Sequence, residues 1–173
     1  MQLDKTKIEL NRFAERVVKI SKLNLGKSVR GRKIDASGRL RNSISHKVDG
    51  ASVSFSFEDY GIYVDAGVVG KKKKILKDWN KSLFKRGSGY SAKFPNITEI
   101  KKWIKNKPIK SRSENGRFVK QNTDSLAFLI GRKIYNEGKQ PTLFFSDAWS
   151  KEFDADKITV AFADDMEDYL NEN

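Results

Sequence analysis

Side chains that can neutralise phosphate groups are concentrated in one stretch of this sequence. Residues 66–121 contain 17 lysines and arginines and three acids, a balance of +14, whereas the rest of the chain contains 18 basic and 19 acidic residues. A lysine run of this kind binds phosphates without reading base sequence, and salt weakens such binding steeply. The candidate contacts for DNA or for a protein partner are Lys71, Lys72, Lys73, Lys74, Lys77, Lys81, Lys85 and Arg86.

Aromatic side chains are interleaved with these bases. Trp79, Phe84 and Tyr90 could stack on nucleotide bases, but aromatic residues more often anchor an arm onto a protein partner. We therefore favour a protein partner over DNA, and a solvated loop that binds neither is the remaining interpretation. The opposite charge lies near the end of the chain, where residues 147–173 contain nine acids and two lysines. A basic stretch and an acidic end would allow complementary contacts between copies of the chain.

The sequence lacks the residues that many catalytic and metal sites need. It contains no cysteine, which excludes disulfides and thiolate ligands, and its single histidine is His46. One histidine makes a Ser-His-Asp triad or a histidine-rich metal site hard to build, and we expect His46 at the edge of a core or an interface. The acidic pairs Asp154/Asp156 and Asp164/Asp165 are expected to be solvated on a helix. The sequence therefore predicts no enzyme, no cofactor and no metal site, and a nuclease is the least favoured alternative.

The clearest structural signal is a β-hairpin. Apolar and polar residues alternate over 40–48 and again over 51–58, with Asp49 and Gly50 between them. This pair suits a type I′ turn, which requires positive φ angles. One face of the hairpin would cover a core, and the residues on that face are Leu40, Ile44, Val48, Val53, Phe55 and Phe57.

Helical periodicity predicts the remaining elements. Long helices are expected over residues 3–24, 123–137 and 154–170, and another is expected to contain Ile100 and Ile104 and to begin at Asn96 or Thr98. A helical turn is expected over 60–67, and a short helix capped by Thr142. The predicted loops are residues 26–38, the basic stretch 70–94, read as a long loop or protruding arm, and residues 105–122.

These elements predict an α+β fold, in which a small antiparallel sheet built on a β-hairpin packs against several α-helices, with a long basic arm or loop. The chain would form a single domain of residues 1–173, with a core of 1–69 and 122–173 and a basic arm of 70–121. No stretch approaches the ~20 apolar residues that span a bilayer, and the N-terminus does not read as a secretory signal. We therefore expect a protein that is made in a host cytoplasm and has no membrane partner.

Three stretches, in this order, resemble the tail-completion or head–tail joining (neck) proteins of long-tailed bacteriophages, similar to the HK97-type tail-completion component. Residues 36–44 resemble the opening of the family's first strand, residues 60–67 the segment after its hairpin, and residues 126–149 its late helix and turn. The residues that carry the likeness are Gly38, Leu40, Ser43, Ile44, Tyr63, Val64, Gly67, Gly138 and Pro141. Val68 stands where the family usually has threonine, and the basic arm is longer than in the family.

The resemblance implies a structural virion protein without catalytic activity, located at the neck or tail junction. Copies would form a homo-oligomeric ring that joins a portal or adaptor protein to the tail or to a neighbouring ring. The ring would line the DNA channel, with at most non-specific contact with packaged DNA. The alternative is a small DNA-binding protein without sequence specificity, which would use the basic central arm as its working surface.

Overall fold

The structure, a computed structural model, describes residues 3–29, 32–35, 37–72, 78–84, 94–106, 111–112, 115, 118–119 and 122–172. The chain divides into two compact units: unit 1 consists of Met1–Gly61 and Leu143–Asn173, and unit 2 consists of Ile62–Thr142. Unit 2 is therefore inserted between two parts of unit 1. The boundaries between core and arm that the sequence predicts lie elsewhere, at 69/70 and 121/122, and the single domain stays a prediction.

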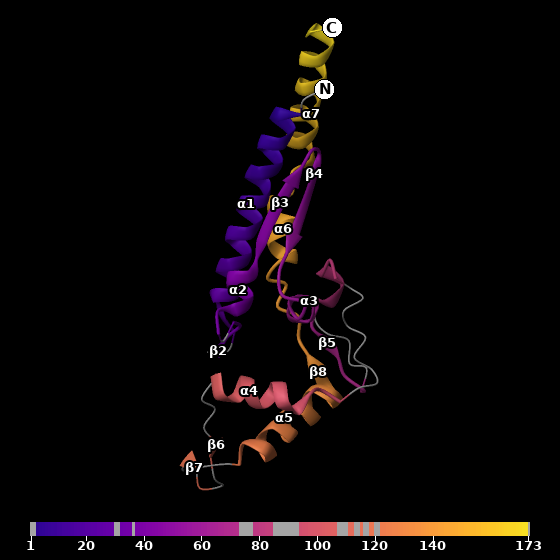
Figure 1. Cartoon of the computed structure of the whole chain (residues 1–173). Coiled ribbons are helices and arrows are strands. Elements are labelled where there is room, and N and C mark those ends of the chain that lie inside the picture. Colours follow the sequence, from indigo (N-terminus) through magenta and orange to yellow (C-terminus); the bar gives the residue numbers. More distant parts are fainter. Residues whose placement is uncertain are drawn as a thin grey trace. The chain divides into compact units, whose positions relative to one another are not determined.

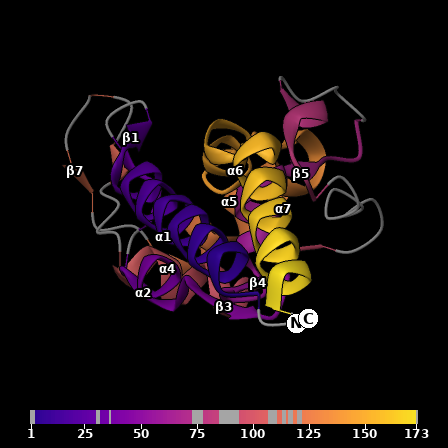
Figure 2. The ribbon, with the colours of Figure 1, turned by 90° about the horizontal axis from the view of Figure 1, so that it is seen from above.

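Unit 1 combines helices with one main hairpin. Its elements are α1 (Asp4–Gly26), β1 (Ser28–Val29), β2 (Arg32–Lys33), α2 (Arg39–Ser43), β3 (Ser45–Asp49), β4 (Ser52–Ser56), α6 (Ser146–Glu152) and α7 (Ala155–Glu172). Strands β3 and β4 pair antiparallel around the Asp49–Gly50 turn, as the alternation predicts. Exposed and half-buried residues alternate in both strands, so one face of the hairpin covers the core. Helix α1 lies beside this hairpin and beside α7 (Figures 1 and 2).

Aromatic rings join the elements of unit 1. Phe13 of α1 contacts Phe55 of β4 edge-on, with 6.2 Å between ring centres, and contacts Trp149 of α6 at 5.1 Å. Phe55 also contacts Phe145 at 5.3 Å. Each edge-to-face pair stabilises by roughly 1 kcal/mol beyond the area that it buries. The most buried apolar residues of α1 are Leu10, Phe13, Ala14, Val17 and Leu25, so one side of the helix lies in the core.

The start of the first predicted strand is wrong. Residues 39–43 form helix α2, and β3 begins only at Ser45. Leu40 and Ile44 are four residues apart, a spacing that fits one side of a strand and one side of a helix equally well. Asp35 favours the helix, because its carboxylate accepts hydrogen bonds from the backbone N–H groups of Gly38 at 3.0 Å and Arg41 at 3.1 Å. The expected loop over 26–38 also contains a short antiparallel pair, β1 with β2.

Unit 2 contains shorter elements. They are α3 (Gly61–Ala66, starting at the unit boundary), β5 (Val68–Val69), the 3-10 helix η1 (Trp79–Lys81), α4 (Ile97–Asn106), β6 (Ser111–Arg112), β7 (Phe118–Val119), α5 (Thr123–Glu137) and β8 (Gly138–Lys139). Strand β5 pairs antiparallel with β8, and β6 with β7. Asn96 and Asn122 cap α4 and α5, accepting from the N–H groups of Thr98 and Asp124, each at 2.9 Å. Helix α4 packs on α5 through Ile97, Ile100, Ile104, Leu126, Ala127 and Ile130.

The predicted α+β class is confirmed by these elements, with helices on the apolar face of the β3–β4 hairpin. The arm of 70–121 is described only at residues 70–72, 78–84, 94–106, 111–112, 115 and 118–119. In the part of the chain that the structure describes, no helix combines the length and apolar character needed to cross a bilayer.

Candidate interaction surfaces

The described lysines of the predicted basic site are exposed. Lys71 and Lys72 follow β5, and their backbone N–H groups donate to the carbonyl oxygens of Tyr135 at 2.7 Å and Asn136 at 3.0 Å. The ammonium of Lys71 also lies 5.9 Å from the centre of the Tyr135 ring. Lys81 lies in η1 and pairs with Asp78 at 2.9 Å. The other predicted contacts, Lys73, Lys74, Lys77, Lys85 and Arg86, lie outside the described residues, as does Tyr90.

The residues of the first family-like stretch have structural positions in unit 1. Gly38 has φ +77° directly before α2, and Leu40 and Ile44 are both 2% exposed. The Ser43 hydroxyl donates to the Leu40 carbonyl at 2.9 Å and accepts from the N–H of Glu58 at 3.1 Å. Ser43 therefore ties the end of α2 to the segment that follows β4.

The second and third family-like stretches meet in unit 2. Gly67 and Gly138 both have positive φ angles, +75° and +81°, and lie at the β5–β8 pair. A Cβ atom on Gly138 would collide with the Val68 carbonyl oxygen, and one on Gly67 would lie 2.5 Å from the Lys139 carbonyl oxygen and 2.7 Å from the nitrogen of Pro141. Only glycine permits this approach of the two backbones at both positions.

Thr142 does not cap a helix, contrary to the sequence-based expectation. Its backbone N–H and its hydroxyl donate to the Val64 carbonyl at 3.2 and 2.7 Å, so Thr142 joins the two ends of unit 2. Helix α6 begins later, at Ser146, without a side-chain cap. Tyr63, the remaining residue of the second stretch, is 40% exposed.

Asp165 is buried, although an acid beside another acid on α7 was expected to be solvated. It is 4% exposed, and its carboxylate accepts from the N–H of Lys5 at 3.0 Å and from the N–H and hydroxyl of Thr6 at 2.8 and 2.6 Å. Burial raises the pKa of Asp165, but these hydrogen bonds outweigh burial and hold the pKa below its usual value. Asp165 therefore fixes α7 at the N-terminus of α1, where a negative charge is favourable.

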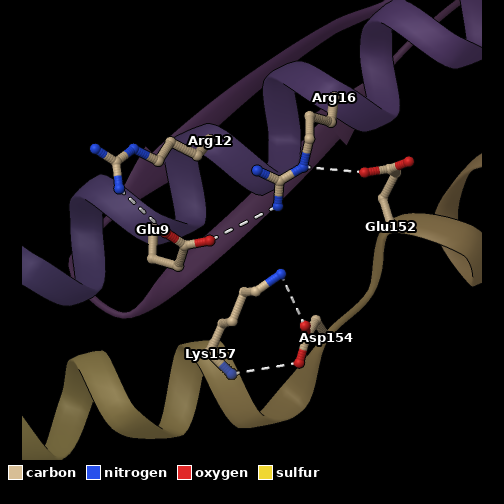
Figure 3. A network of polar contacts seen from close by, with 6 residues as sticks. All are labelled: Glu9, Arg12, Arg16, Glu152, Asp154 and Lys157. Carbon is tan, nitrogen blue, oxygen red and sulfur yellow. Dashed lines mark hydrogen bonds and ion pairs between the residues drawn. The ribbon is translucent and has the colours of Figure 1, made fainter.

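A groove of about 520 Å³ lies between α1 and α7 in unit 1. Figure 3 shows the charged network beside it: Arg16 lies between Glu9 and Glu152, at 3.7 and 3.0 Å. Lys157 pairs with Asp154 at 3.0 Å, and this contact lowers the pKa of Asp154. The Arg16–Glu152 pair links α1 to the last residue of α6. Residues that line the groove are Lys5, Ile8, Glu9, Arg12, Asp156, Lys157, Val160, Ala161 and Asp164.

Helix α7 exposes an apolar row on a side that does not face α1. The row consists of Phe162, Met166 and Leu170, spaced by four residues, with exposed fractions of 41%, 36% and 69%. The apolar residues of α7 recur at helical spacing, but this row is not the side of the helix that packs. Asp165 lies on the packing side instead. We call these three residues the α7 row.

Helix α5 exposes apolar and basic residues together. Phe128 and Leu129 are each 52% exposed, and Arg132 and Lys133, one turn further on, are also exposed. The Phe128 ring stacks on Phe94 at 5.7 Å, which supports it from one side. We call Phe128, Leu129, Arg132 and Lys133 the α5 face. Neither the α5 face nor the α7 row was identified from the sequence, because helical periodicity shows which residues are apolar but not which side finds a partner.

His46 is half-buried on the core side of β3, opposite Phe55, with 6.5 Å between ring centres. Among the described residues, no group of three or more histidine, aspartate or glutamate side chains is arranged to hold a metal ion. Comparisons with protein-family models, with curated proteins and with solved structures found no significant match to this chain.

Proposed function

We propose that this chain is a structural subunit of a ring at the head–tail junction of a tailed bacteriophage, where it joins a portal or adaptor protein to the tail. The observation that carries this proposal is the pair of exposed apolar surfaces, the α7 row and the α5 face. Contiguous apolar patches on a protein surface are typical of protein–protein contacts, whereas scattered apolar residues are not. Two such patches on one chain suit a subunit that contacts a neighbour on each side.

The phage assignment draws on the order of the three family-like stretches. The described geometry supports a structural role for them, since Ser43 links two segments and Gly67 and Gly138 allow two backbones to approach. These residues shape the fold and present no reactive group. A subunit whose function is mechanical needs residues of this kind.

Electron microscopy tests the ring directly. Purified protein should form closed rings in negative stain, and antibodies against the chain should label the junction between capsid and tail on intact particles. A protein that stays monomeric at every concentration, or labelling elsewhere on the particle, would contradict the proposal.

The positive charge of unit 2 suggests how such a ring would bind DNA. Residues 62–142 contain 20 basic and six acidic residues, and Lys71 and Lys72 are exposed. A basic lining would hold DNA without reading its sequence. Particles in which Lys71, Lys72, Lys73 and Lys74 are all alanine should lose packaged DNA more readily, and unchanged retention would remove the DNA contact from the proposal.

The same charge favours the second candidate, a DNA-binding protein that works without a ring. A gel shift with purified monomer at physiological salt separates the two. A ring subunit should bind DNA feebly before assembly, whereas a DNA-binding protein should shift it as a monomer. The affinity of either should fall steeply as salt is raised.

A further inference from the structure

We infer that copies of this chain contact one another head to tail, with the α7 row of one copy packed on the α5 face of the next copy. The inference rests on the proposed function and names the two surfaces that would build the ring. It requires no particular placement of unit 1 against unit 2, because each surface belongs to a single unit.

The α7 row lies on a helix that is attached to α1 by its opposite side. Asp165 attaches α7 to the start of α1, and the 2.7 Å ion pair between Lys5 and Asp168 adds a second link at the same end. These contacts hold one side of α7 in unit 1 and leave the row exposed. Leu170, at the outer end of the row, is 69% exposed.

The charge around the α7 row is acidic. Helix α7 contains six acids and one lysine, and two of these acids, Asp165 and Asp168, are already bound to the start of α1. Glu167 lies one residue from Met166 and is exposed. A partner that buries the row must therefore bring basic side chains to its border, since unpaired charges at an interface are costly.

The α5 face has the complementary character. The opposite side of α5 packs on α4 through Ala127, and Phe94 covers Gly131, so Leu129 lies on the outward side of the helix. Arg132 and Lys133 border Leu129 with positive charge. Of the two acids on α5, Asp124 pairs with Lys101 at 2.8 Å, and Glu137 lies four residues beyond Lys133 at the end of the helix.

Charge also favours a contact between two different surfaces of neighbouring copies over a symmetric contact between two identical surfaces. Two α7 rows packed together would set acidic helices against each other, and two α5 faces would bring Arg132 and Lys133 of both copies together. Like charges across an interface cost affinity. A contact between the α7 row of one copy and the α5 face of the next avoids both repulsions. Each copy then keeps one surface available for another copy, so the contact is repeated from copy to copy until a ring closes.

Two single variants and their mixture test this contact. Leu170→Glu places an acid in the α7 row, and Leu129→Glu places one in the α5 face. Both side chains are at least half exposed, so both variants should fold. Leu23→Glu, at a leucine on α1 that is 60% exposed, is the matched control. Circular dichroism checks folding, and sedimentation velocity measures association.

The expected result is specific to a head-to-tail contact. Leu23→Glu should associate as the unmodified protein does, and each test variant alone should be monomeric. An equimolar mixture of Leu170→Glu and Leu129→Glu should give a dimer and nothing larger. The intact α7 row of one variant can bind the intact α5 face of the other, but both remaining surfaces are blocked.

Other outcomes overturn the inference in distinguishable ways. If both variants still form rings, the inferred surfaces are wrong while the proposed ring stands. If only one of the two substitutions abolishes association, the contact is symmetric or involves a different surface. If the unmodified chain never associates, the ring and its surfaces fail together.

A charge exchange gives an independent check on the same pair of surfaces. Glu167→Lys and Lys133→Glu should each weaken association, and the two together in one chain should restore it. The loss in each single variant should shrink as salt is raised, because salt screens charges at an interface border. No restoration in the double variant would show that these two side chains do not face each other.

Discussion

Gly138 is a residue at which a side chain has no room. Its φ angle of +81° is rarely adopted by residues with a Cβ atom, and that atom would collide with the Val68 carbonyl oxygen. Gly138→Ala should therefore lower the free energy of unfolding by about 2 kcal/mol, through backbone strain and a disrupted β5–β8 pair. Urea denaturation measures the loss.

Gly26→Ala is the control for that substitution. A Cβ atom on Gly26, the last residue of α1, would meet nothing within 4 Å, and its φ angle is not positive. Alanine there should leave stability unchanged or raise it by up to about 1 kcal/mol. Equal effects at the two glycines would mean that the β5–β8 approach is not a constraint.

Asp165 makes the stability of unit 1 depend on pH. Its pKa in the folded protein lies below the ordinary value of 3.8. The stability that its ionised form contributes is therefore fully present when the pH is above 3.8. That contribution should disappear as the pH falls below 3.8 through the lowered pKa. Urea midpoints measured at neutral pH and at successively lower pH should show this loss in the unmodified protein.

The Asp165→Asn variant should be less stable at neutral pH and should lack this part of the acid transition. An amide carries no charge for the N-terminus of α1, and its NH₂ group would replace one of the two acceptor oxygens, so that it faces the N–H donor of either Lys5 or Thr6. Asp164→Asn, at the exposed neighbouring acid, is the control and should behave as the unmodified protein. An identical acid transition in Asp165→Asn would assign that transition to other groups.

Residue-level features were the least accessible to sequence reasoning. Most acids on a helix surface are solvated, and nothing local distinguishes Asp165 from Asp164, because the donors to Asp165 lie at the opposite end of the chain. The glycines were easier to identify. Gly67 and Gly138 each follow a helical segment, where a positive φ angle is common.

At the scale of elements, the hairpin is the feature that sequence determines best. Apolar and polar residues alternate on both sides of Asp49-Gly50, and this alternation leaves few alternatives for the register of the two strands. The observed pairing of His46 with Phe55 and of Val48 with Val53 follows from that register. Helix α2 was missed because Leu40 and Ile44 satisfy two periodicities at once. The exposed α7 row was missed because periodicity shows that a side of a helix is apolar and not whether that side is covered.

Phe55 is the side chain through which the hairpin joins the helices. Its ring contacts those of Phe13, Phe145 and Trp149 at 6.2, 5.3 and 5.6 Å between centres. Phe55→Ala should cost about 3 kcal/mol of unfolding free energy, because it leaves a cavity among these rings. Thermal denaturation should show the drop. Ser54→Ala, on the exposed face of the same strand, should change stability by no more than about 0.5 kcal/mol.

At the scale of the whole molecule, the basic stretch of residues 66–121 lies entirely within unit 2. Unit 2 contains 20 basic and six acidic residues, whereas unit 1 contains 15 basic and 16 acidic residues. The positive stretch is evident from the sequence, whereas the unit boundaries are not. Composition changes gradually along a chain, whereas the boundaries depend on contacts such as that between Thr142 and Val64.

The insertion of unit 2 into unit 1 leads to a prediction for a shortened chain. The hydrogen bonds from Thr142 to Val64 bring the two ends of unit 2 together, so a short glycine–serine linker should replace residues 62–142. The shortened chain keeps the aromatic contacts of Phe13 and Phe55 and should unfold cooperatively with helical circular dichroism. It should also be monomeric, because it keeps the α7 row but lacks the α5 face. A shortened chain that is unfolded would show that unit 1 depends on unit 2 for its core, and one that still forms rings would place the contact between copies within unit 1.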